Sequence, residues 1–452
     1  MPEFPNLRMA LRSWVEEAMV HLTYDPEAQE FLKYPPRWEC DQDGIFREIE
    51  RPVCAWRHRS LEALKEIPTW NVVLEVLEGD ERLRVQIGNL VGTLHHARRI
   101  DTFTIGLHVL PRPGEKIDFD RRYLELDQFF GAEELEHVVL WSIPGLIGTH
   151  FPVVLEADVE LGVMSDQELA YALDVEVVRT IFPRTRLLDP QPEHRTCLRY
   201  KYLLPKKIGE SQHDETFRQI QDLQYHIEAL RTRLEKSLAL VLREPVVIAG
   251  RLDMSTVWSL SGGVAFQQYP PRRPGLARLP VHLNQEQKSD LVEIWKCIKN
   301  SEIQTENNGL ALALRRLSYQ ANRERPEDEL LDVMIAAEAL YLSGGSSGKE
   351  RGELGYRMAL RAALWAQPGE NRFSPREIFK LMKCAYDVRS IIAHGDKLKS
   401  RDIKILDMQV SLAELVFEVE GVVKSGCRRA LVEIASNSTL WPPDWDGLAL
   451  GQ

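Results

Sequence analysis

The sequence predicts an α+β protein in which a mixed N-terminal module precedes an all-helical C-terminal module. Three observations support this prediction. Short segments rich in valine and isoleucine, bounded by glycine or proline, recur between about residues 70 and 255, and such segments are typical of strands. A segment dense in glycine and proline follows at 259–280 and is typical of a linker. Beyond it the strand pattern disappears and helical periodicity takes over.

The boundaries of the two modules follow from these shifts in pattern. The predicted N-terminal α+β module covers residues 1–270, a linker covers 271–283, and the helical bundle covers 284–452. A chain of 452 residues is long enough for two such modules, each with its own hydrophobic core.

Composition and charge exclude several classes of protein. No apolar run approaches the roughly 18 residues that span a bilayer, and the N-terminus lacks a signal-peptide pattern, so we expect no membrane association. The six cysteines form no CxxC pair, which argues against a disulfide framework or a zinc site and favours a cytoplasmic location. A net charge of -11 excludes a general nucleic-acid coating protein but permits a local basic site.

The N-terminal module is expected to combine helices with strands. Residues 9–22 carry apolar side chains at three- and four-residue spacing, which predicts an amphipathic helix. The valine- and isoleucine-rich segments predict strands at 71–79, 103–111, 137–146 and 244–252. Residues 155–163 alternate between apolar and acidic side chains, and this alternation predicts a half-buried strand with an acidic outer face.

One long helix is predicted at residues 214–243. Its apolar side chains step by three and four residues, the spacing of a coiled-coil seam, at Ile220, Leu223, Ile227, Leu230 and Leu234. Two interpretations remain open. The seam packs on the sheet of its own domain, or it forms a dimer contact.

The C-terminal third is predicted to be a bundle of helices at 284–300, 307–323, 327–342, 349–366, 375–394 and 402–436. Pro326 and Pro375 stand where they can open helices, and Gly395 stands where it can close one. Trp441 and Trp445 lie in a proline-stiffened tail, which we expect to fold back on the bundle.

The segment "YDVRSIIAHGDK", residues 386–397, places Arg389 five residues before His394. Such a pair has little meaning alone, because about one is expected by chance in this composition. A second segment of the sequence gives the pair more meaning. Glu338 lies in the otherwise apolar segment "DELLDVMIAAEALYL", and a carboxylate on a buried helix face needs a partner, usually an arginine. If the two helices pack side by side, Glu338 can orient Arg389.

These residues resemble the Apea-like branch of the HEPN family. The resemblance covers about residues 310–425 and rests on the order of three blocks, "DELLDVMIAAEALYLSGG", "ELGYRMALRAALWA" and "IFKLMKCAYDVRSIIAHG". It implies a small helical bundle that dimerises and brings the Arg and His of both protomers into one cleft. It also implies a metal-independent ribonuclease, because many members are toxins or antiphage effectors of that kind. Arg389 and His394 are the positions that match the family's catalytic pair.

The position after the arginine departs from the family pattern. Clearly catalytic members often have Asn, Asp or His there, whereas this chain has Ser390. A serine hydroxyl can still donate a hydrogen bond to a phosphate. The alternative interpretation is structural, with His394 capping a helix and Arg389 paired with Glu338 or Asp387.

The two residue types suit RNA cleavage without a metal. Histidine, with an ordinary pKa near 6.5, can act as base or acid near neutral pH. Arginine keeps its proton and can bind phosphate oxygens through its planar fork, so it can stabilise the charge of the phosphorane. Along a straight helix five residues rotate a side chain by roughly 140° and advance it about 7.5 Å. The pair therefore shares a face only if the helix ends between them, and a two-fold dimer is expected to supply the remaining groups.

Basic residues cluster around this motif. Between 376 and 404 eight Lys or Arg face four acidic residues, a local excess of +4 that favours a phosphate backbone. The expected RNA-binding residues are Lys383, Lys397, Lys399 and Arg401.

The leading hypothesis is a cytoplasmic HEPN ribonuclease that binds RNA and acts as a homodimer through the C-terminal bundle, without cofactor or metal. Antiphage defence or a toxin-like role follows from the resemblance. The N-terminal module is then the expected seat of regulation, with a phage-derived or nucleotide trigger. The alternative is a non-catalytic HEPN module that dimerises and senses a nucleotide or nucleic acid. Catalysis requires Arg389 and His394 to face a cleft, whereas the structural interpretation predicts that they are buried and paired.

Overall fold

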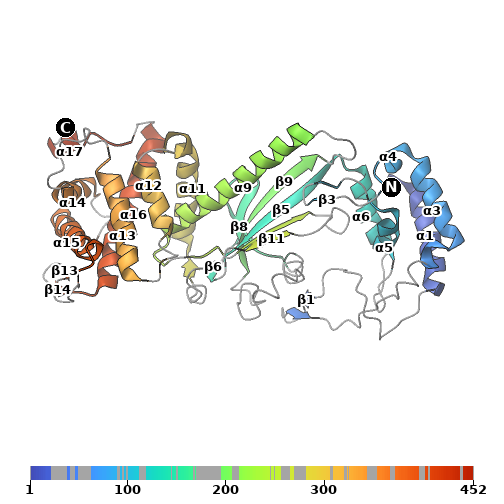
Figure 1. Cartoon of the computed structure of the whole chain (residues 1–452), viewed down its shortest axis with the longest axis horizontal. Coiled ribbons are helices and arrows are strands. Elements are labelled where there is room, and N and C mark those ends of the chain that lie inside the picture. Colours follow the sequence, from blue (N-terminus) through green and yellow to red (C-terminus); the bar gives the residue numbers. More distant parts are fainter. Residues whose placement is uncertain are drawn as a thin grey trace. The chain divides into compact units, whose positions relative to one another are not determined.

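The protein is described by a computed structural model. The residues that it describes are 2–21, 38–40, 46–48, 63–88, 92–93, 96–97, 100–110, 119–143, 145–148, 151–165, 168, 195–205, 213–244, 246–248, 250–255, 265–268, 281–305, 309–319, 323, 325–343, 354–366, 372–396, 403–405, 408–437 and 441–450. The fold is α+β, with a sheet in the N-terminal part and a helical C-terminal part (Figure 1). No helix among these residues has the length and apolar character needed to cross a membrane.

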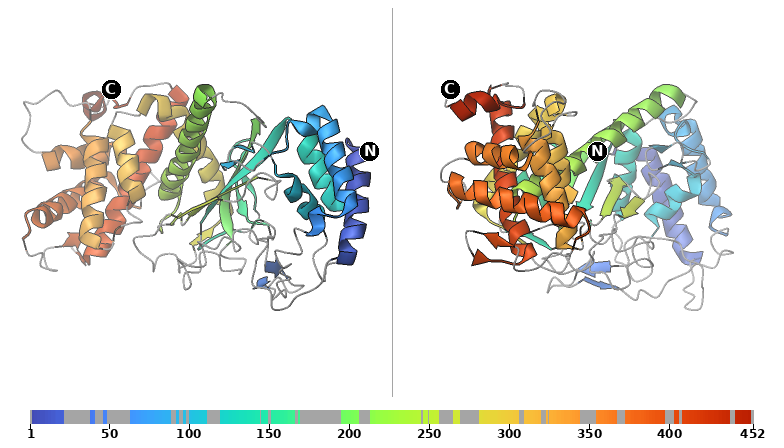
Figure 2. Two further views of the ribbon diagram at one scale, coloured as in Figure 1. Left: turned by 45° about the vertical axis from the view of Figure 1, so that its right-hand side comes forward. Right: turned by 60° about the vertical axis from the view of Figure 1, so that its left-hand side comes forward.

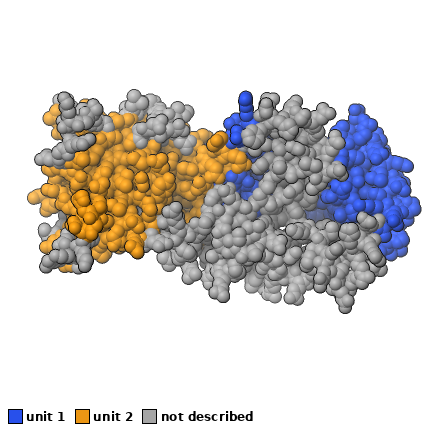
Figure 3. Space-filling view, in the orientation of Figure 1, with its two compact units in different colours: residues 1–142, 156–223, 249–269 blue, residues 143–155, 224–248, 270–452 orange. Residues whose placement is uncertain are grey.

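The chain forms two compact units that each contain separate stretches of sequence (Figure 3). Unit 1 comprises residues 1–142, 156–223 and 249–269, and unit 2 comprises 143–155, 224–248 and 270–452. This division differs from the predicted boundary near residue 270, because two stretches of the expected N-terminal module belong to unit 2. The reason is pairing over long sequence distances. Within unit 2, for example, β6 (Leu146–Gly148) pairs in parallel with β12 (Val281–Leu283), inside the predicted linker.

The helices of unit 1 enclose an aromatic core. They are α1 (Pro5–His21), α3 (Pro68–Gly79), α4 (Glu81–Arg84), α5 (Thr102–Val109) and α6 (Phe119–Gly131). The rings of Trp14 and Trp70 lie 4.8 Å apart, and Phe103 meets Trp70 edge-on at 5.6 Å. A side chain on Gly106 would collide with both tryptophans at 2.8–2.9 Å, so this close packing depends on glycine. The predicted helix at 9–22 is confirmed as α1.

Two predicted strands of this region are wrong. Residues 71–79 form most of α3, and residues 103–111 lie largely in α5. The helical alternative is visible in the burial pattern, because α3 buries Trp70, Val73 and Leu77 at steps of three and four residues. Short apolar runs do not distinguish a strand from a buried helix by periodicity alone.

The strands of unit 1 form an antiparallel sheet in the order β11-β10-β5-β9-β8. Their bounds are β5 Glu134–Ser142, β8 Val159–Val163, β9 Thr196–Pro205, β10 Gly250–Ser255 and β11 Ala265–Gln268. Two short hairpins accompany them, β1 (Trp38–Cys40) with β2 (Phe46–Glu48) and β3 (Gly92–Thr93) with β4 (His96–Ala97).

The sheet confirms residues 137–142 of the predicted strand at 137–146, as part of β5. The other predicted strands are shorter than expected. The segment 244–252 contributes only its end, as the start of β10. In the segment 155–163 only Val159–Val163 is a strand, and Ala157 and Val163 are exposed rather than buried. The acidic face of β8 is partly neutralised, since Arg199 of β9 pairs with Glu160. Residues 265–268 of the expected linker segment form β11.

The long helix α9 (His213–Val241) confirms the predicted helix at 214–243. Its residues from 224 onward belong to unit 2, where Ile227, Leu230 and Leu234 are fully buried. The guanidinium of Arg233 lies 5.0 Å from the ring of Trp295 on α11, so one partner of the helix is α11. This part of the seam is therefore buried within the chain. The side chain of Ile220 lies outside the described residues.

The helical bundle of unit 2 follows the prediction closely. Its helices are α11 (Gln285–Thr305), α12 (Gly309–Tyr319), α13 (Pro326–Tyr341), α14 (Leu354–Trp365), α15 (Pro375–Ala393), α16 (Leu412–Asn437) and the short α17 (Trp445–Leu450). Prolines begin α13 and α15 as expected. The helix α13 packs on both α12 and α16 (Figure 1 and Figure 2). A two-residue strand, β7 (Val153–Val154), also belongs to this unit.

The last long helix begins ten residues later than predicted. Its place from residue 404 is taken by a hairpin of β13 (Lys404–Ile405) and β14 (Met408–Gln409). Ser411 then caps α16, since its hydroxyl accepts from the backbone N–H of Glu414 and the Glu414 carboxylate accepts from the Ser411 backbone N–H. This reciprocal cap fixes where the helix starts.

The aromatic tail folds back on the bundle, as predicted. The rings of Trp441 and Trp445 lie 5.4 and 5.7 Å from the ring of Trp365. Their indole N–H groups donate to the hydroxyl and the carbonyl of Ser343, respectively.

Candidate functional site

The candidate site lies on α15, whose start is defined by a capping box. The hydroxyl of Ser374 accepts from the backbone N–H of Glu377, and the Glu377 carboxylate accepts in return from the Ser374 backbone. These hydrogen bonds from Ser374 hold the pKa of Glu377 below its ordinary value. Pro375 occupies the first turn, where its missing N–H has no cost.

The end of α15 is defined by Gly395. This glycine has a φ of +75°, in the left-handed region that favours glycine at a helix end. Its N–H donates to the carbonyl of Ile392, and the N–H of Asp396 donates to that of Ile391. His394 is the C-cap residue, and its N–H donates to the carbonyl of Ser390 at 3.1 Å. The helix therefore closes at the histidine, as the glycine predicted.

Arg389 is held beside Glu338 on the neighbouring helix α13. The distance from Nη2 of Arg389 to Oε1 of Glu338 is 3.4 Å, and both side chains are 29% exposed. The guanidinium also lies 5.9 Å from the ring of Tyr386. Its Nε is buried without a hydrogen-bond partner among the described residues. The contact expected from the sequence is thus present, and Arg389 is half-buried beside Glu338.

His394 is exposed, and it does not share a face with Arg389. The helix continues to Ala393, and His394 at its C-cap keeps helical backbone angles (φ -85°, ψ -4°), so the backbone follows the helical path from one residue to the other. Five helical residues separate them by roughly 140° of rotation and about 7.5 Å along the axis. A single copy of the chain therefore presents the arginine and the histidine in different directions.

The supporting residues differ in exposure. Ser390 is half-buried, and Asp387 is exposed beside it on the helix. Lys383 is exposed, as an RNA-binding residue requires. The other three residues expected to bind RNA, Lys397, Lys399 and Arg401, lie outside the described residues.

The hairpin of β13 and β14 packs beside α15, and sequence reasoning missed it. The backbone of Lys404 on β13 is hydrogen-bonded to the thiol of Cys384 on α15. Burial raises the pKa of that thiol, so it stays protonated near neutral pH and is a poor nucleophile. The hairpin exposes Lys404 and Met408 at this end of the bundle. A signal was available in two short alternations of apolar and polar residues, Ile-Lys-Ile at 403–405 and Met-Gln-Val at 408–410.

Arg389 lies in the last turns of α15, and His394 is its C-cap residue. The described residues contain no group of three or more His, Cys, Asp or Glu that could hold a metal ion. The guanidinium of Arg389 carries the planar donors that suit a phosphate, and His394 is open to solvent at the helix end.

Comparisons of this chain with models of known protein families, with curated proteins and with solved structures found no match.

Proposed function

We propose that this protein is a metal-independent endoribonuclease of the HEPN type, with an active site completed by two copies of the chain. Arg389 and His394 are its catalytic residues, and Glu338 orients the arginine. The observation that supports the proposal best is the arrangement of α15, with Arg389 held against Glu338 and His394 exposed at the helix end. From the resemblance to the HEPN family, we infer that the protein acts as an antiphage or toxin-like effector. Its trigger acts on the N-terminal part.

The proposed reaction needs no group beyond the RNA and these side chains. The 2'-oxygen attacks the phosphorus, and the bond from phosphorus to the 5'-oxygen breaks. His394 takes the 2'-OH proton in one copy, and the imidazolium of the other copy protonates the departing 5'-oxygen. Arg389 binds the phosphate oxygens and stabilises the charge that develops there. The products are a 2',3'-cyclic phosphate and a 5'-hydroxyl. DNA is not a substrate, because it lacks the 2'-OH that attacks the phosphorus.

The dimer is part of the proposal because of helix geometry. In one chain Arg389 and His394 point in different directions, and a two-fold axis near the end of α15 can place the arginine of one copy beside the histidine of the other. The exposed Lys383, and the basic residues that follow α15 in the sequence, then serve the RNA backbone.

The alternative function is a non-catalytic HEPN module that dimerises and senses a nucleotide or a nucleic acid. The ion pair between Arg389 and Glu338 favours it, since an arginine already paired to a carboxylate can have a purely structural role.

The proposal is tested on the full-length wild-type protein with a structured RNA, in buffer that contains EDTA. We expect cleavage to continue in EDTA and to leave a 2',3'-cyclic phosphate on each upstream product. A substrate with a single 2'-deoxynucleotide at a mapped cleavage site should resist cutting there. Cleavage that EDTA abolishes, or that leaves a 3'-hydroxyl, would count against this mechanism.

Substitutions of Arg389 distinguish catalysis from structure. We expect Arg389→Ala to lower the cleavage rate by about 10²–10³-fold, the usual cost of losing one donor to the developing charge. Arg389→Lys keeps the charge but loses the planar guanidinium, so its cleavage rate should lie between those of the wild type and Arg389→Ala. Glu338→Gln should reduce the rate less, because it changes the orientation of the arginine only. The measurement is single-turnover RNA cleavage at equal dimer content, and equal rates for Arg389→Ala and wild type would remove the arginine from the mechanism.

A further inference from the structure

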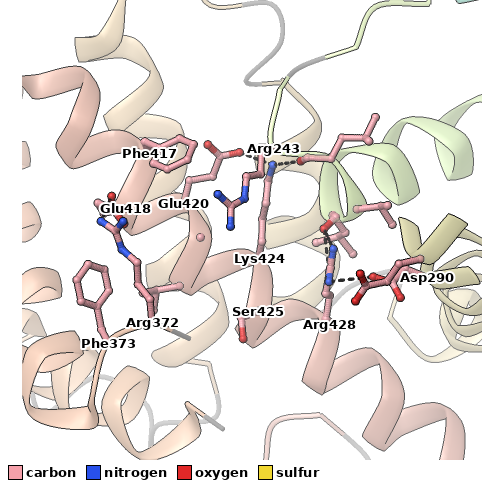
Figure 4. A pocket seen from close by; sticks show the side chains of 16 residues that line it. Arg243, Asp290, Arg372, Phe373, Phe417, Glu418, Glu420, Lys424, Ser425 and Arg428 are labelled. Atoms are coloured by element: carbon pink, nitrogen blue, oxygen red, sulfur yellow. Dashed lines mark hydrogen bonds and ion pairs between the residues drawn. The ribbon is translucent and has the colours of Figure 1, made fainter. Parts of the chain in front are cut away.

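Unit 2 contains a cavity of about 550 Å³ at the other end of α15 from His394. It is lined by residues from the end of α9, the start of α11, the segment before α15 and the middle of α16: Leu240, Val241, Leu242, Arg243, Glu286, Asp290, Arg372, Phe373, Phe417, Glu418, Glu420, Gly421, Val422, Lys424, Ser425 and Arg428 (Figure 4). The rise of α15 places Arg372 and His394 on the order of 30 Å apart. The cavity is thus separate from the proposed nuclease site.

We propose that this cavity binds a nucleoside phosphate, with the ring against its phenylalanines and the phosphate on its arginines. The volume lies in the range of cavities that take small ligands. Phe373 and Phe417 supply aromatic faces, and Phe417 is 45% exposed. Arginine guanidinium groups lie near both rings, 4.7 Å from Phe373 for Arg372 and 5.8 Å from Phe417 for Arg243.

Two of the four carboxylates that line the cavity, Glu418 and Glu420 on α16, are recessed behind cationic side chains. The other two, on α11, are more open: Glu286 is exposed, and Asp290 is half-buried. Glu418 is 14% exposed, whereas Arg372, its ion-pair partner, is 66% exposed. Glu420 is only 7% exposed and pairs with Lys424 at 2.5 Å. A ligand that enters from solvent therefore meets guanidinium groups before it meets these two carboxylates.

Arg243 is the cation best placed to receive a phosphate. It is exposed, and the structure gives it no ion pair to any described carboxylate. Two other cations of the cavity are already engaged with the last carbonyls of α9. Lys424 donates to the carbonyl of Leu242 at 2.8 Å, and Arg428 donates to that of Leu240. These bonds neutralise the negative end of α9, which would otherwise repel an anion.

The helix α16 has an exposed glycine, Gly421, where it lines the cavity. A Cβ at this position would meet no atom within 4 Å, so packing does not require glycine there. Gly426, five residues further along α16, is different, because a Cβ there would come within 2.3 Å of the Tyr341 hydroxyl. A glycine inside a helix costs roughly 0.5–1 kcal/mol relative to alanine. Gly421 lines the cavity, and its missing side chain enlarges it.

The test is isothermal titration of the dialysed full-length protein with AMP and with GMP, beside adenosine and inorganic phosphate. We expect at least one nucleotide to bind more tightly than adenosine or phosphate, since both parts of the ligand make contacts. Arg243→Glu should weaken that binding by about tenfold to hundredfold, the usual cost of losing a charge-assisted hydrogen bond. Gly421→Leu should abolish it by filling the cavity. Arg325→Glu, an exposed arginine outside the cavity, should bind like wild type.

Three results would overturn this inference. The first is absence of binding of either nucleotide to the wild type at millimolar concentration. The second is unchanged affinity in Gly421→Leu, which places the ligand elsewhere. The third is equal affinity for inorganic phosphate and nucleotide, which means that the ring is not recognised. RNA cleavage is not needed for any of these measurements, so the outcome is independent of the proposed nuclease activity.

Discussion

Replacement of His394 by alanine should lower RNA cleavage in EDTA by about 10²–10⁴-fold. The expected size is that of general acid–base catalysis, and both copies of the dimer lose the group. His394 is exposed at the C-cap of α15, and its backbone N–H, not its side chain, bonds to Ser390. The substitution should therefore leave the fold and the dimer intact. The measurement is the single-turnover rate constant at matched dimer content.

The control for this experiment is His282→Ala, which removes another exposed histidine of unit 2, on β12. That variant should cleave at the wild-type rate. If His394→Ala cleaves as fast as wild type while its dimer content is unchanged, the histidine has no part in the chemistry. If His282→Ala loses activity as well, the loss reflects a general disturbance of the unit.

The largest expected effect on stability is that of Trp365→Ala. Trp365 is 2% exposed, and its indole N–H donates to the carbonyl of Gly426 at 3.0 Å. The guanidinium of Arg429 lies 3.9 Å from its ring, and both tail tryptophans pack on it. Truncation of a buried tryptophan leaves a cavity and typically costs about 3–5 kcal/mol. We expect the free energy of unfolding of unit 2 to fall by that amount in urea, followed by circular dichroism.

Leu364→Ala is the matched control, because the neighbouring leucine on α14 is 36% exposed. It should cost less than about 1 kcal/mol, as most partly exposed substitutions do. A similar loss in the two variants would mean that the aromatic cluster adds nothing beyond the helix propensity of α14.

The elements that the sequence predicted correctly are those with a local signal. The bundle helices have apolar periodicity together with proline starts, and α15 adds a capping box at Ser374 and a closing glycine at position 395. The contact between Glu338 and Arg389 could be anticipated because a carboxylate in an apolar helix needs a partner.

The errors arose where the outcome depended on contacts distant in sequence. Residues 71–79 and 103–111 are rich in β-branched side chains, and they became helices because Trp70 and Phe103 pack against Trp14 of α1. The hairpin of β13 and β14 stands where the start of the helix 402–436 was predicted, and it packs on α15. In each case tertiary packing outweighed local propensity.

The cavity of unit 2 could not be predicted, because four separate segments build it. Its two arginines with nearby aromatic rings, Arg243 and Arg372, are 129 positions apart in the printed sequence, and no spacing rule connects them. The motif of the candidate site, in contrast, was visible in the sequence. What the sequence did not show is how a second copy of the chain is oriented, because that orientation is not a property of a single chain.

The division of each unit among separate stretches of the chain also has a consequence for synthesis. The ribosome completes every stretch of unit 1 by residue 269, whereas unit 2 then still lacks all of its helices from α11 onward. Domains made first tend to fold first. For the proposed nuclease, the regulatory part would thus already exist when Arg389 and His394 emerge. The same interleaving means that a cut near residue 270 does not release a complete bundle, because residues 143–155 and 224–248 would remain on the other fragment.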